Sequence, residues 1–93
     1  MINGDINKFI EIMSYGGELV FLFDGKKYFL QGWSKGAKYH MALVTWEPWS
    51  EGYLWKKSSK ISMQKLADEF VRAPLFDGKT FWEVEREIEW VDC

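Results

Sequence analysis

The chain has 93 residues, of which 47 % are hydrophobic and 28 % are charged, and its formal net charge is −2. This length leaves room for one domain, residues 1–93, and the composition is that of a globular protein rather than a disordered one. A single cysteine excludes an intrachain disulfide, and a single histidine excludes the usual multi-histidine zinc sites. Aromatic residues are unusually frequent at 18 %. They predict either a core built from large side chains or an exposed aromatic surface used for recognition.

Residues 5–17 have the pattern of an amphipathic helix. Asp5 is a plausible N-cap, and the two glycines at the end of this segment favour a helix stop. The apolar positions fall at i, i+3, i+4 and i+7, which places them on one face of a helix. They are Ile6, Phe9, Ile10 and Met13.

The next two apolar stretches, residues 18–23 and 26–31, are separated only by Asp24 and Gly25. This spacing and this dipeptide predict a β-hairpin with a two-residue type I′ turn. Such a turn fixes the register, and the apolar face of the hairpin should then meet the core. The predicted cross-strand pairs are Leu19 with Leu30 and Phe21 with Tyr28 on the apolar face, and Val20 with Phe29 and Leu22 with Lys27 on a mixed face.

Residues 32–37 predict a turn, because they contain two glycines around a tryptophan. Residues 38–46 alternate as a third strand, which ends before Pro48 in a loop, and residues 53–57 predict a fourth strand. All these connections are too short for a crossover helix, so the strands should form an antiparallel meander.

Ser62 is a good N-cap for a helix over residues 63–73. The tail supports two interpretations: Thr80 and Glu83 form a capping box, whereas the residues that follow alternate as in a strand. We interpret it as a short helix over residues 80–87 followed by an extended end. The predicted fold is therefore α+β, with an N-terminal helix, a three- or four-stranded antiparallel meander and C-terminal helices packed on the sheet.

Two short motifs resemble those of a group of small uncharacterised bacterial α+β proteins. The early motif is GGE at residues 16–18 followed by DGKKY at residues 24–28, and the closing motif is FDGKTFWE at residues 76–83. The resemblance covers about a third of the chain. The group has no assigned activity, so the resemblance implies an α+β fold and no catalytic residue.

Charge is unevenly distributed along the chain. Residues 26–60 carry seven lysines and two glutamates, a net charge of +5, whereas the segments before and after carry −3 and −4. The lysines fit strand ends and edges, where they discourage aggregation. Alternatively, lysines interleaved with aromatic rings are typical of a surface that binds single-stranded nucleic acid.

The sequence contains no recognisable catalytic arrangement. There is no phosphate-binding glycine loop and no cysteine–histidine cluster, and His40 stands alone in a predicted strand. We therefore predict a non-enzymatic module without cofactor or metal, which binds a protein partner stoichiometrically as an inhibitor, immunity-type or phage-type accessory factor. The alternative is single-stranded nucleic-acid binding through the basic aromatic sheet, residues 26–60. The predicted partner-binding residues are Trp46, Trp49, Tyr53, Trp55, Trp82, Glu83 and Glu87.

The sequence shows neither the basic and apolar pattern of a signal peptide nor an apolar run long enough to span a membrane. Together with the single cysteine, this favours the cytoplasm. The predicted strand over residues 53–57 is suited to the edge of the sheet, where it can pair with a second copy in a homodimer.

Overall fold

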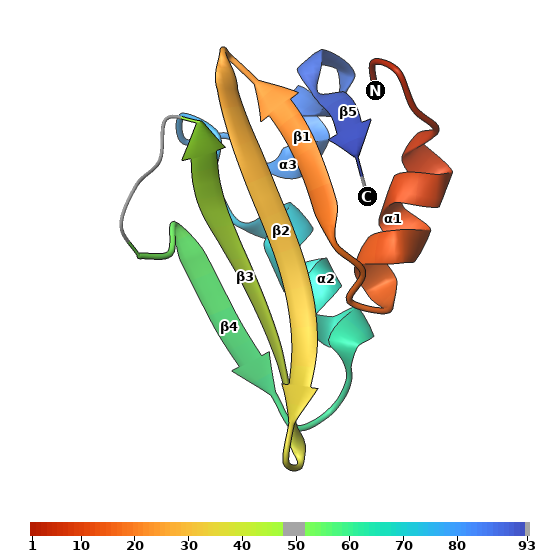
Figure 1. Cartoon of the computed structure of the whole chain (residues 1–93), viewed down its shortest axis with the longest axis vertical. Coiled ribbons are helices and arrows are strands. Elements are labelled where there is room, and N and C mark those ends of the chain that lie inside the picture. Colours follow the sequence, from red (N-terminus) through yellow and green to blue (C-terminus); the bar gives the residue numbers. More distant parts are fainter. Residues whose placement is uncertain (48–51, 93) are drawn as a thin grey trace.

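The computed structural model describes residues 1–47 and 52–92, with three helices on one side of a five-stranded sheet (Figure 1). The elements in chain order are α1 (Ile6–Ser14), β1 (Leu19–Phe23), β2 (Lys26–Lys35), β3 (Lys38–Glu47), β4 (Trp55–Ser59), α2 (Met63–Arg72), α3 (Phe81–Val84), a 3₁₀ turn (Glu85–Glu87) and β5 (Glu89–Asp92).

The sheet has the strand order β4-β3-β2-β1-β5, and all its neighbouring strands are antiparallel. This confirms the predicted α+β class, but the strands number five rather than three or four. The additional strand is the C-terminal segment, which returns to pair with β1 and places Trp90 opposite Phe21. The predicted helix followed by an extended end is also confirmed. β4 lies at one edge of the sheet, as predicted.

The first hairpin has the predicted turn and register. Asp24 and Gly25 both have positive φ angles, 51° and 77°, as a type I′ turn requires. Leu19 pairs with Leu30 and Phe21 with Tyr28. These four side chains lie in the core, so the turn chemistry and the burial pattern specify the same register.

The turn predicted over residues 32–37 is confined to Gly36 and Ala37, and the prediction is wrong for residues 32–35. β2 continues through this segment as far as Lys35, and Trp33 is a strand residue opposite His40. A glycine is required at position 32 by close packing and not by a turn. A Cβ atom there would lie 2.8 Å from the Cα atom of Gly16 and 2.9 Å from the sulfur of Met63.

Each predicted helix start is confirmed by a cap. The Asp5 carboxylate accepts a hydrogen bond from the Asn7 backbone N–H at 2.8 Å, and the Ser62 hydroxyl accepts one from the Lys65 N–H at 3.1 Å. At α3, the Glu83 carboxylate accepts a hydrogen bond from the Thr80 N–H at 2.9 Å. These bonds satisfy N–H groups that the first turn of a helix leaves without a partner.

The core lies between the helices and one face of the sheet, and phenylalanine rings fill much of it. The phenylalanines that are almost completely buried are Phe9, Phe21, Phe70, Phe76 and Phe81. By contrast, no tryptophan in the described part of the chain is fully buried. Phenylalanine therefore builds much of the core, whereas the described tryptophans all keep part of their surface accessible. Within the described ranges, no helix combines the length and apolarity needed to cross a membrane.

Candidate functional site

The sheet has one face directed toward the helices and one face directed away from them (Figure 1). We call the second the open face. Alternate residues of each strand lie on it, because successive side chains of a strand point to opposite sides. On the three strands considered below, these are Lys27, Phe29, Gln31, Trp33 and Lys35 of β2, Lys38, His40, Ala42, Val44 and Trp46 of β3, and Lys56 and Ser58 of β4. Val20 and Leu22 of β1 lie beside them.

A first group of rings lies toward the end of β3. The rings of Phe29 and Trp46 are 5.6 Å apart between centroids and inclined by 42°. The Lys27 ammonium lies 5.8 Å from the centre of the Trp46 ring, close enough for a cation–π interaction. Trp46 is 48 % exposed, so much of its ring surface is available to a ligand.

A second group of rings lies toward the β2–β3 turn. Trp33 and His40 are stacked, with centroids 5.3 Å apart and planes inclined by 18°. His40 Nδ1 lies 2.7 Å from the Ser58 hydroxyl, in hydrogen-bond contact. The Lys56 ammonium lies 5.8 Å from the Trp33 ring and 4.9 Å from the Tyr53 ring. Contacts across three strands thus hold the Trp33 ring in place, and a cation accompanies it.

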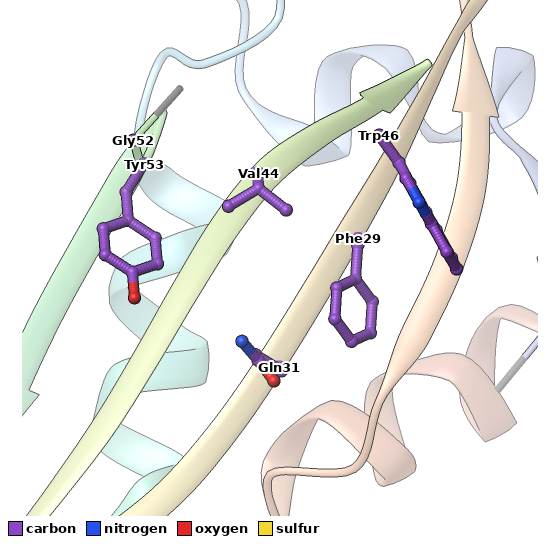
Figure 2. Close-up of a pocket in the computed structure, with 6 residues that line it drawn as sticks. All are labelled: Phe29, Gln31, Val44, Trp46, Gly52 and Tyr53. Carbon is purple, nitrogen blue, oxygen red and sulfur yellow. The ribbon is translucent and has the colours of Figure 1, made fainter. Parts of the chain in front are cut away.

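A hollow of about 510 Å³ lies on this face between the two groups of rings. Trp46 and Tyr53 lie on opposite sides of it, with Val44, Phe29 and Gln31 between them (Figure 2). The volume is in the range of small-molecule sites, and most of the lining is aromatic or apolar. The hollow is therefore suited to a flat ring that stacks on aromatic side chains.

The predicted partner-binding residues do not form one surface. Trp46 and Tyr53 lie beside the hollow on the open face. Trp55 pairs with Leu43 on the helix side of the sheet, and its ring lies 5.4 Å from that of Phe70. Trp55 therefore contributes to packing against α2. The prediction for Trp49 falls outside the described residues.

The remaining predicted residues lie in the C-terminal helical segment. Trp82 on α3 is 52 % exposed. Its neighbour Glu83 forms the capping box, and the hydrogen bond from the Thr80 backbone lowers the pKa of the Glu83 carboxyl. Glu87 borders a second hollow, of about 370 Å³, together with Asp24 and Asp77. The described residues thus form two separate candidate surfaces. The open face places lysines over tryptophan rings, whereas the second hollow combines Phe23 and Phe76 with Lys79 and acidic side chains.

The second hollow brings together the two motifs on which the sequence resemblance rests. Asp24 and Asp77 both have positive φ angles, and each is followed by a glycine with positive φ. The rings of Phe23 and Phe76, which precede the two aspartates, lie 5.5 Å apart in an edge-to-face contact. The pKa of the nearby Tyr28 hydroxyl is raised, mainly by burial and further by the negative charges of Asp77 and Asp24. The DG turns of the two motifs therefore meet at one end of the domain, whereas the GGE segment lies just before β1, where Gly16 is close to Gly32. The positive φ angles account for Asp24, Gly25, Asp77 and Gly78.

The predicted site residues included Trp46 and Tyr53 but not Phe29, Gln31 and His40, although the strand pattern placed His40 on the same face as Trp46. The signal was present in the period-two alternation of β2 and β3, which assigns these residues to one side of the sheet. The mispredicted turn at residues 32–37 concealed it, because Trp33 then had no assigned face.

No cluster of three histidine, cysteine, aspartate or glutamate side chains that could hold a metal ion occurs within residues 1–47 and 52–92. Comparisons with protein-family models, curated proteins and solved structures found no match to this chain. Function is therefore inferred from the arrangement of its own residues.

Proposed function

We propose that this chain is a small non-enzymatic binding module and that its open face holds single-stranded nucleic acid. The observation that carries this proposal is the pairing of rings with cations, since Lys27 lies over Trp46 and Lys56 over Trp33. Proteins that bind single strands combine cations for the phosphates with aromatic rings on which bases stack. The proposed setting is the cytoplasm.

The spacing of the rings fits a ligand with several flat groups. Phe29 and Trp33 are four residues apart on β2, which corresponds to about 13 Å along a strand. RNA-recognition sheets use a comparable arrangement, in which aromatic residues of adjacent strands stack two or three bases. The two groups of rings therefore supply two stacking sites for one extended strand.

Lysine content favours a polyanion over a protein as the ligand. Lysine is depleted in protein–protein interfaces, where burying an ammonium group is costly. Here, Lys56 lies within 6 Å of two aromatic rings, and Lys35 and Lys38 face each other at the end of the same surface. Phosphate groups would neutralise these charges and release counterions.

The accessible ring surface on the open face favours a single strand over a duplex. In a duplex the bases are already stacked on one another, and grooves admit a helix or a two-stranded ribbon rather than the face of a broad sheet. In a single strand each base has a free face, so Trp46 and Trp33 each have a surface to stack against.

The test compares three tryptophan-to-alanine variants in fluorescence anisotropy titrations of a labelled oligothymidylate. We expect Trp33→Ala and Trp46→Ala to weaken binding about fivefold or more, because stacking is worth about 1–3 kcal/mol per base. Trp82→Ala removes an equally large exposed ring from the helical side and is the matched control. Equal affinities in all four proteins, with folding confirmed by circular dichroism, would contradict the proposal.

A protein partner is the second candidate and uses the other surface. Trp82 is exposed beside Glu83, and interface energy is commonly concentrated in such aromatic anchors while nearby acids steer association. In this role the module would act stoichiometrically, as an inhibitor, immunity-type or phage-type accessory factor. A pull-down from native lysate with and without nuclease separates the candidates: a protein that survives nuclease and is lost with Trp82→Ala supports this one.

A further inference from the structure

A small hollow of about 230 Å³ lies at one corner of the open face. It is found where β3 begins and β4 ends, at the end of the sheet that carries the β2–β3 turn (Figure 1). Its volume is below the range of about 300–1,000 Å³ that is usual for sites of drug-sized ligands, so it suits a compact group. The side chains that line it are all polar, and they are Lys38, Ser58, Ser59 and Lys60.

The positive charges of this hollow are not neutralised by the protein. Within residues 1–47 and 52–92, neither Lys38 nor Lys60 forms an ion pair with a carboxylate. Lys35 lies directly opposite Lys38 across the β2–β3 turn, and like charges in this position repel one another. An anion bound in the hollow would offset this repulsion, because its charge attracts the neighbouring ammonium groups.

The serine hydroxyls of the hollow add hydrogen-bonding groups to these charges. The Ser59 hydroxyl accepts a hydrogen bond from the Ile61 backbone N–H at 3.0 Å, and a hydroxyl carries one proton of its own. In the described part of the chain, this proton has no acceptor. Ser58 Oγ lies 2.7 Å from His40 Nδ1, which fixes its position beside the stacked Trp33 and His40 rings. The hollow therefore offers two ammonium groups and a hydroxyl donor, a set of groups that suits an oxyanion.

We infer that this hollow is a phosphate site and that it holds one phosphate of the strand bound on the open face. The inference rests on the proposed function and deepens it. Lys38 and Ser58 lie on the open face, so the hollow is continuous with the surface that carries the stacking rings. Phosphate is the anion that a bound strand supplies, and lysine and serine side chains are among the groups that contact it in nucleic-acid complexes. A free phosphate ion has the same chemistry, so the experiment uses both sources.

The first measurement is an amide NMR titration of the nitrogen-15-labelled protein with inorganic phosphate. Sodium acetate at the same ionic strength is the control for a nonspecific effect of anions. We expect phosphate to shift the backbone amides of Lys38 and of residues 58–60, and acetate to shift them less. Ser59→Ala keeps every charge and should weaken phosphate binding about threefold or more, as expected for the loss of one hydrogen-bond donor.

The second measurement is the salt dependence of oligothymidylate binding. Lys38→Gln combined with Lys60→Gln removes both ammonium groups from the hollow. Lys8→Gln combined with Lys57→Gln removes the same charge from α1 and from the helix side of β4, and is the matched control. All four lysines are exposed, so both double variants should fold. Loss of one phosphate contact should reduce the magnitude of the slope of log affinity against log salt concentration by about 0.7 in the first double variant and leave the slope unchanged in the second.

The outcomes separate the site, the source of the phosphate and the proposed function. If phosphate shifts these amides no more than acetate does, the hollow is not a phosphate site, and the proposed function stands as long as oligothymidylate binds. If phosphate binds but the two double variants have equal slopes, the hollow takes a free phosphate ion, and the contact with the strand is wrong. If the unmodified protein does not bind oligothymidylate, the proposed function fails together with the strand contact, whereas amide shifts with phosphate still support the phosphate site.

Discussion

Lys56 and Lys57 are neighbours in β4 whose side chains lie on opposite faces of the sheet. Lys56 pairs with Ala42 and approaches the rings of Trp33 and Tyr53, whereas Lys57 pairs with Met41 on the helix side. Replacing each by glutamine removes the same charge from the same strand. Only the loss of Lys56 should weaken nucleic-acid binding through the open face.

The magnitude follows from the number of lysines on the open face. At least three of them, Lys35, Lys38 and Lys56, are placed to contact phosphates. Each phosphate neutralised contributes about −0.7 to the slope of log affinity against log salt concentration for a single strand, so the slope should be about −2 or steeper. An increase from about 50 mM to about 200 mM salt should then weaken binding roughly 20-fold.

The assay is an anisotropy titration of labelled oligothymidylate at several salt concentrations within this range. Lys56→Gln should reduce the magnitude of the slope by about 0.7, and Lys57→Gln should leave the slope unchanged. Urea denaturation checks that both variants are folded, since both lysines are exposed and neither substitution should alter the free energy of unfolding greatly. Equal changes in slope for the two variants would refute an open-face site, because binding would then depend on charge alone.

Two further predictions concern the scaffold. Gly32→Ala should destabilise the domain by about 1–3 kcal/mol, because its Cβ would lie within 3 Å of Gly16 and Met63; an unchanged urea midpoint would contradict this close packing. The pKa of the Glu83 carboxyl is lowered, first by the hydrogen bond that it accepts from the Thr80 backbone. The ionised carboxylate therefore stabilises the folded protein above the unfolded-state pKa, and this stabilisation is lost as the pH falls through the folded-state pKa. Glu83→Gln keeps an oxygen that can accept the Thr80 N–H but removes the charge, so it should destabilise the protein at pH 7 and flatten the fall in thermal stability below about pH 4. Parallel pH profiles of stability for both proteins would refute a contribution of the Glu83 charge.

Local signals specified most of the fold. The Asp24-Gly25 dipeptide fixed both a turn and a register, and Ser62 marked the start of α2. β5 was harder to predict because its pairing with β1 joins residues about 70 positions apart, and nothing in residues 89–92 indicates which edge they reach. Gly32 was misleading because a glycine required by close packing looks the same in a sequence as a glycine required by a turn.

The composition of the candidate site could be predicted from the sequence, but the arrangement of its residues could not. The mixture of lysine and aromatic residues was visible, but the face on which each one lies depends on strand register. Trp55 and Lys56 illustrate this point, since they are adjacent in sequence, yet Trp55 packs against Phe70 while Lys56 reaches Trp33. Seven residues separate β3 from β4, so no two-residue turn motif in the sequence specifies their register. Pattern alone therefore could not separate the packing residue from the candidate binding residue.

Binding at the open face is tested most directly by an amide NMR titration of the nitrogen-15-labelled protein with an unlabelled oligothymidylate of about nine nucleotides. We expect progressive shifts of amides along the ring-bearing segments of β2 and β3 and at Lys56, while amides of α1 on the other side of the sheet stay in place. Shifts confined to Trp82 and the rest of α3, or a spectrum unchanged at saturating oligonucleotide, would contradict binding at the open face.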